Sequence, residues 1–112
     1  MFLQPLFYSM DAPCDILLTS SNYFSWKSRM EDVLQSMGFF RITSGKETEP
    51  TDYEKIKWAN RCDESRGFIG MSISTNFLFH ISGIDEPDKV WEKLESVFGK
   101  HNEIRVINLR MS

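Results

Sequence analysis

The chain has few cysteines and no metal-binding arrangement of them, which excludes several classes of small protein. Its 112 residues contain two cysteines, Cys14 and Cys62, and neither belongs to a CxxC pair or a Cys/His cluster. A structural zinc site is therefore excluded, and we expect no metal and no cofactor. Two lone thiols suit a reducing cytosol and favour buried or unpaired cysteines, although the sequence leaves a single bridge between them open.

A strongly basic character and a long apolar run are also missing. Thirteen Lys and Arg residues against sixteen Asp and Glu give a net charge of −3, which argues against a dedicated nucleic-acid-binding face. The apolar N-terminal residues lack a basic region and are interrupted by Gln4 and Pro5, so they do not resemble a signal peptide. No stretch approaches the roughly 20 apolar residues that cross a bilayer. We therefore predict a soluble, cytoplasmic protein without a membrane partner.

Recognisable catalytic patterns are absent from the sequence as well. It has no Gly-x-Ser-x-Gly turn and no phosphate-binding glycine loop. His80 and His101 each lack a neighbouring histidine, cysteine or well-spaced carboxylate, and the acidic residues lie in helix-surface or capping contexts. We predict that the protein is not an enzyme, has no catalytic residues and takes no small-molecule substrate.

The sequence does contain enough apolar residues for one core. Hydrophobic residues make up 41% of the chain and aromatic residues 13%, which suits a single small domain. We predict an irregular leader over residues 1–20 and a helical domain over residues 21–112. The apolar residues of the last predicted segment recur with a helical spacing up to Met111, next to Ser112. We therefore expect this domain to be incomplete at its C-terminus.

The clearest predicted element is a helix over residues 23–37. Its apolar residues recur with the helical period: they are Tyr23, Trp26, Met30, Val33, Leu34 and Met37. Ser21 or Asn22 is expected to accept a first-turn N–H with its side chain. Gly38 is expected to end the helix in the left-handed conformation.

Further helices are predicted downstream, with one ambiguous segment between them. A second helix begins at Thr51-Asp52-Tyr53-Glu54, which has the form of a capping box, and continues to residue 73. Gly67 and Gly70 within it either allow close helix packing, which we favour, or let the helix bend. Residues 74–83 form either a short helical turn or a strand, since periodicity does not decide so short a run. Residues 85–88 start another helix that ends at Gly99, and a last segment begins at residue 102.

A set of aromatic, aliphatic and polar residues occurs in four blocks along residues 16–111. These residues are Leu18, Asn22, Tyr23, Trp26, Met30, Leu34, Gly38, Trp58, Asp63, Trp91, Leu94 and Phe98. In this order and spacing they resemble the L-x-G-x-N-Y-x-x-W opening and the later W…D and W-x-x-L blocks of copia-type retrotransposon Gag polyproteins, in particular those of plants. Ser20 stands where that family usually has glycine.

The resemblance implies an all-α fold, a small orthogonal bundle of about four to five helices like the N-terminal part of the Gag capsid domain. It also implies a non-enzymatic protein that self-associates into virus-like particles and packages RNA in the cytoplasm. The second capsid half and the CCHC zinc knuckle of the family are not in this sequence. The alternative is therefore a truncated, host-encoded Gag fragment that binds Gag or host proteins.

A bundle of this size cannot bury all of its apolar residues. We expect the apolar residues that stay exposed to form the self-association surface. The candidates are Phe39, Phe40, Phe77, Phe79 and Met111. The expected partners are copies of this chain or other Gag chains. A further alternative is weak RNA binding through basic residues near the C-terminus, which are Lys89, Lys93, Lys100, Arg105 and Arg110.

Overall fold

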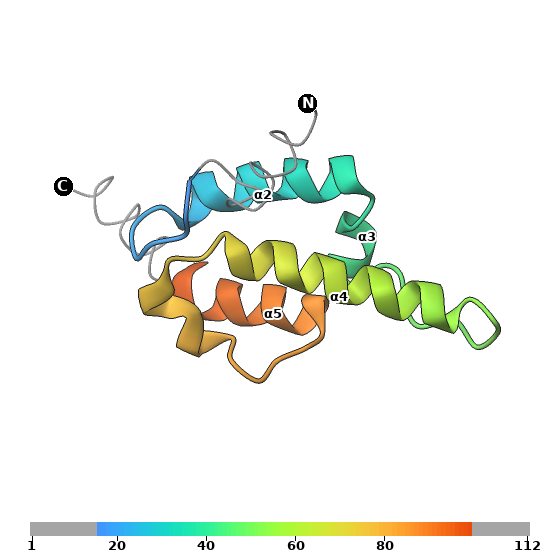
Figure 1. The fold of residues 1–112 in the computed structure, drawn as a ribbon. Coiled ribbons are helices and arrows are strands. Elements are labelled where there is room, and N and C mark those ends of the chain that lie inside the picture. The colour runs from blue at the N-terminus through green and yellow to red at the C-terminus, as the bar shows by residue number, and fades with distance from the viewer. Residues whose placement is uncertain (1–15, 100–112) are drawn as a thin grey trace, which may run out of the picture.

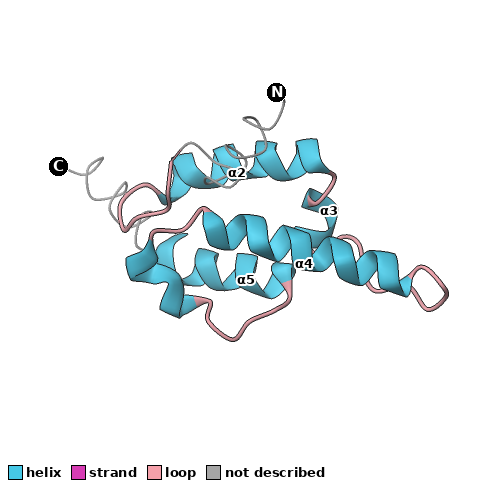
Figure 2. Ribbon diagram, in the orientation of Figure 1, coloured by secondary structure: helices cyan, strands magenta, loops and turns pink. Residues whose placement is uncertain are grey.

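The computed structural model describes residues 16–99, which form a small all-α bundle (Figures 1 and 2). Its four α-helices are α2 (Tyr23–Met37), α3 (Phe40–Thr43), α4 (Lys55–Met71) and α5 (Pro87–Leu94). A 3-10 helix, η1 (Thr75–His80), precedes α5, and a π-helical turn, η2 (Glu95–Gly99), continues it. Over this range the β pairing is limited to an isolated parallel bridge between Leu18 and Ile73. The predicted fold class is confirmed.

Helix α2 is the element whose sequence and structure agree best. Its apolar stripe faces the core, where Tyr23, Trp26, Met30 and Leu34 are buried. Gly38 has a φ of 79° and donates its N–H to the Gln35 carbonyl, while the Phe39 N–H bonds to the Leu34 carbonyl. This pair of bonds is a Schellman motif, which ends the helix at the predicted glycine.

Two details of the α2 prediction are wrong. Met37 is 47% exposed, because the chain turns at Gly38 and Phe39 covers the core in its place. Asn22 makes no side-chain cap. Its Oδ1 accepts the Thr19 N–H at 2.8 Å and its Nδ2 donates to the Leu17 carbonyl at 2.8 Å. The Asn22 side chain therefore holds the preceding loop in place instead of capping the first turn.

Helix α4 begins later than its sequence predicts. It starts at Lys55, and no side chain caps its N-terminus. The Asp52 Oδ1 accepts the Glu54 N–H at 2.9 Å, so this short local bond replaces the predicted capping box. The helix ends at Met71, and Ile73 lies beyond it in the bridge to Leu18.

The predicted close packing at the two glycines of α4 is also wrong. A Cβ atom added at Gly67 would meet nothing within 4 Å, and at Gly70 it would meet only the Arg66 side chain. The Arg66 guanidinium donates to the carbonyls of Ile84 and Ile81, at 2.7 and 3.3 Å. Arg66 therefore ties α4 to the loop before α5, where the helices were expected to touch through glycines.

Residues 74–83, for which the sequence allows either a helical turn or a strand, contain the 3-10 helix η1. Gly83 follows it with a φ of 83°, a left-handed conformation that suits a turn. Helix α5 begins at Pro87 as predicted, since proline is well suited to the first helical position. The predicted segment from residue 102 onward lies outside the described residues.

Candidate interaction surfaces

The residues shared with the Gag pattern lie mostly in one core. Thirteen buried side chains form it, and eight of them belong to that pattern: Leu18, Tyr23, Trp26, Met30, Leu34, Trp91, Leu94 and Phe98. The Trp26 Nε1 donates to the Ser72 carbonyl at 2.8 Å, so the largest buried side chain is also hydrogen-bonded. Trp58 is half-buried and Asp63 is exposed. Most of the pattern therefore specifies the core, and the surface has to be sought elsewhere.

The predicted self-association residues do not form one patch. Phe39 is buried, because its ring packs against Phe68 of α4 at 5.9 Å, and its prediction as a surface residue is wrong. Phe40 and Phe77 are half-buried against the core. Phe79 is 67% exposed. Met111 lies outside the described residues.

Phe79 belongs to a group of rings that runs from the core to the surface. The His80 ring lies 4.0 Å from Phe79 and 5.5 Å from Phe98, and Phe77 lies 5.6 Å from Phe98. Phe98 in turn stacks near Tyr23 of α2. We call this group of Phe77, Phe79, His80 and Phe98 the aromatic end; Phe98 is its buried member and Phe79 its exposed one. It lies where η1 meets η2, near the end of the described chain (Figure 1).

A second surface feature, at the other end of α5, was not predicted. It is a cavity of about 390 Å³ lined by residues of α3, α4 and the start of α5. Its apolar residues include Ile42, Ala59, Trp58, Cys62 and Pro87. It is also lined by one lysine, Lys89, and by six carboxylates, which are those of Glu47, Glu49, Asp63, Asp85, Glu86 and Asp88. We call this feature the acidic pocket. Sequence reasoning missed it because three separate segments supply its walls.

Two groups in the acidic pocket have unusual environments. The Trp58 indole N–H is buried and has no hydrogen-bond acceptor within the described part of the chain. Burial, together with the negative charges of Asp63 and Asp88, raises the pKa of the Cys62 thiol to about 11. The thiol is therefore neutral near pH 7 and is a poor nucleophile.

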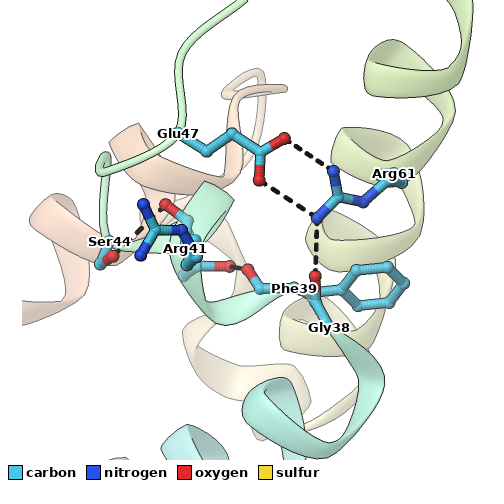
Figure 3. A network of polar contacts seen from close by, with 7 residues as sticks. Gly38, Phe39, Arg41, Ser44, Glu47 and Arg61 are labelled. Carbon is cyan, nitrogen blue, oxygen red and sulfur yellow. Dashed lines mark hydrogen bonds and ion pairs between the residues drawn. The ribbon is translucent and has the colours of Figure 1, made fainter.

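A polar anchor beside this pocket fixes α4 against the end of α2 (Figure 3). The Arg61 guanidinium donates to the Glu47 carboxylate at 2.7 Å and to the Gly38 carbonyl at 2.7 Å. The Gly38 carbonyl lies at the negative end of α2, which favours a cation there. Arg61 therefore ties together the end of α2, the following loop and α4.

The N-terminal end of α4 lies beyond this anchor and has few neighbours. Residues 51–57 are all exposed, and this end of the helix projects from the bundle (Figure 1). Tyr53 is 89% exposed and Ile56 is 75% exposed, more than any other large apolar side chain described. We call residues 51–57 the α4 tip. One signal in the sequence could have found it, because Ile56 falls outside the spacing of the buried residues of α4.

Two buried titratable groups among residues 16–99, Tyr23 and Cys62, have raised pKa values. Burial, together with the charges of Glu95 and Glu31, raises the pKa of Tyr23 above its usual range. In the described ranges no three His, Cys, Asp or Glu residues are grouped so that they could hold a metal ion. Residues 16–99 also contain no helix that is both long and apolar enough to span a membrane.

Comparison with known proteins gives a single result. No protein-family model, curated protein or solved structure matches this chain. The likeness to copia-type Gag therefore stays a prediction from the sequence. The geometry adds three surface features, which are the aromatic end, the acidic pocket and the α4 tip.

Proposed function

We propose that this chain is a Gag-like assembly module that acts by self-association in the cytoplasm. Its contribution to virus-like particles is structural, and it carries out no catalysis. The resemblance to copia-type Gag motivates the proposal, and the exposure of Phe79 at the aromatic end is the observation that carries it.

The physical argument starts from the cost of leaving a phenylalanine in water. Fully burying such a side chain is worth about 1.5–3 kcal/mol. Phe79 is 67% exposed although Phe77 and His80 beside it are half-buried. The His80 ring contacts the Phe79 ring at 4.0 Å and restricts its motion, so less side-chain entropy is lost when a partner covers Phe79. Rigid, exposed aromatic residues are the usual energetic centres of protein interfaces.

The environments of the nucleophilic and basic side chains support a non-enzymatic role. The Cys62 thiol has a raised pKa and is buried. The His80 ring packs among Phe77, Phe79 and Phe98, and within residues 16–99 it forms no ion pair with a carboxylate. General acid–base or nucleophilic catalysis requires such groups to meet in a cleft, at hydrogen-bonding distance from each other.

Light scattering over a range of protein concentrations tests this function. We expect the wild-type chain to form particles much larger than a dimer and Phe79→Ser to shift their formation to higher concentration. Met37→Ser is the matched control, since Met37 is also an exposed apolar residue but lies at the far end of α2. A stable small oligomer that blocks the assembly of a longer Gag chain would favour the fragment alternative. A chain that stays monomeric at high concentration would refute self-association.

A further inference from the structure

Two hollows of the surface follow each other along helix α5. At α5 the acidic pocket is lined by Asp88 and Lys89. A second cavity, of about 710 Å³, is lined by residues that come next on this helix and its π-helical turn, which are Trp91, Glu92, Glu95, Ser96 and Gly99. In the loop after α3, Ser44 lines the second cavity and its neighbour Gly45 lines the acidic pocket. We call the two hollows together the α5 track.

The chain leaves the described bundle at one end of this track. Gly99, the last described residue, is buried and lines the second cavity. A Cβ atom at this position would lie 3.4 Å from the Tyr23 ring and 3.3 Å from the Glu95 side chain. The residues that follow Gly99 therefore start at the track. We propose that residues 100–112 lie along the α5 track of their own chain and reach the acidic pocket.

The track carries negative charge that the described residues do not neutralise. Three of its carboxylates form ion pairs, which are Glu95 with Lys27, Glu49 with Lys55 and Glu47 with Arg61. Five others have no ion pair within residues 16–99, against the single unpaired lysine Lys89; they are Asp63, Asp85, Glu86, Asp88 and Glu92. Burial, and after it carboxylates of the track, raise the pKa of Tyr23 at one end and of Cys62 at the other. The track therefore favours an occupant with positive charge.

The sequence of residues 100–112 supplies such an occupant. It contains one carboxylate, Glu103, and three cations, which are Lys100, Arg105 and Arg110. Its apolar residues are Ile104, Val106, Ile107, Leu109 and Met111. The track offers apolar surface to these side chains, since Phe24, which is 45% exposed, lines the second cavity and Ile42 and Pro87 line the acidic pocket. Charge and apolar surface therefore match on the two sides.

The length of the segment fits the track as well. Helix α5 and η2 together cover residues 87–99, and residues 100–112 are the same number of residues. Even as a helix, with a rise of about 1.5 Å per residue, the segment would extend about 20 Å, which is the length of α5 and η2. A segment attached at Gly99 also meets its own track at a higher effective concentration than the track of another copy. The occupant is therefore the segment of the same chain.

Amide hydrogen exchange of the full-length chain, at a concentration where light scattering finds a monomer, tests the docking. We expect residues 100–112 to exchange at least about tenfold more slowly than a free peptide of the same sequence. Arg105→Glu/Arg110→Glu and Asp85→Lys/Glu92→Lys should each remove most of this protection, because each weakens the attraction between segment and track.

Matched variants separate the track from a general effect of net charge. Arg41→Glu/Lys57→Glu and Asp32→Lys/Glu64→Lys make the same changes in net charge at exposed positions that do not line the track. Both should keep the protection of residues 100–112. Equal losses in a track variant and its matched control would contradict the charged track.

A disulfide locates the segment. In a Cys14→Ser/Cys62→Ala background that also carries Glu92→Cys, at least one of Ile104→Cys, Ile107→Cys and Met111→Cys should form an intramolecular disulfide on air oxidation. With Lys57→Cys in place of Glu92→Cys, none should, because Lys57 lies on α4 and does not line the track.

Two results would overturn this inference. One is exchange of residues 100–112 as fast as in the free peptide. The other is protection that appears only as protein concentration rises, which would mean that the segment binds another copy. The inference does not rest on the proposed function, since a monomer with a protected segment would refute self-association alone. A docked segment also keeps its three cations against carboxylates, and so away from RNA.

Discussion

Helices α2 and α4 are similar in length but are held in the bundle in different ways. Helix α2 buries four large or medium-sized side chains along its whole length. Helix α4 buries Cys62, Ser65 and Ile69 only, all in its central and C-terminal parts. Polar contacts supply much of the rest, through Arg61, Arg66 and the 2.6 Å hydrogen bond between Ser65 and Thr43. A helix held by apolar packing has most of its apolar side chains buried, whereas a helix held by a few polar contacts can leave the apolar side chains of one end exposed to a partner.

The largest expected effect comes from α2. Trp26→Ala removes a fully buried ring and the hydrogen bond to the Ser72 carbonyl, and should lower the free energy of unfolding by about 3–5 kcal/mol. Urea denaturation followed by circular dichroism measures it. Met37→Ala on the same helix is the control and should change the free energy by less than about 0.5 kcal/mol. A small loss for Trp26→Ala would show that α2 is not the packed helix of the bundle.

The polar anchor of α4 should have an intermediate effect. Arg61→Ala removes the bonds to Glu47 and to the Gly38 carbonyl, which are partly exposed, and should cost about 1 kcal/mol. Arg61→Lys keeps the charge but loses the two-pronged geometry, so it should recover only part of the loss. Full recovery with lysine would mean that charge alone holds α4 in place.

The pH dependence of stability should reveal the buried thiol of α4. Burial raises the pKa of Cys62 to about 11, whereas an unfolded thiol has a pKa of about 8.5. Between these values the folded state binds the proton more tightly, so stability falls as pH rises. Below this window the thiol contributes no pH dependence. Comparing Cys14→Ser with Cys14→Ser/Cys62→Ala by thermal unfolding at about pH 8 and pH 9.5 isolates the effect. Equal slopes in the two variants would place the thiol in solvent.

The smallest expected effect on stability comes from the α4 tip. Ile56→Lys replaces a side chain that is 75% exposed, so the free energy of unfolding should change by less than about 0.5 kcal/mol. Urea denaturation followed by circular dichroism measures it. A large loss of stability would mean that Ile56 packs within its own chain and is not available to a partner.

The contrast between the two helices also explains what the sequence could predict. The span of α2 follows from a strict apolar period and a glycine at its end. The start of α4 does not follow from its sequence, because the hydrogen bond from the Glu54 N–H to the Asp52 carboxylate forms in place of the capping box between Thr51 and Glu54. The burial of Phe39 cannot be read from spacing, because it depends on the reversal of the chain at Gly38, which turns the Phe39 ring toward Phe68. The acidic pocket is assembled from three segments and needs tertiary structure to be seen.

Amide hydrogen exchange of the full-length chain at low and high protein concentration compares the two helices most directly. We expect α2 to be strongly protected at both concentrations, since its core packing does not depend on a partner. Protection of η1 should increase with concentration as copies associate. Protection of η1 that does not change with concentration, or exchange in α2 as fast as at the α4 tip, would contradict a packed bundle that binds other copies at its aromatic end.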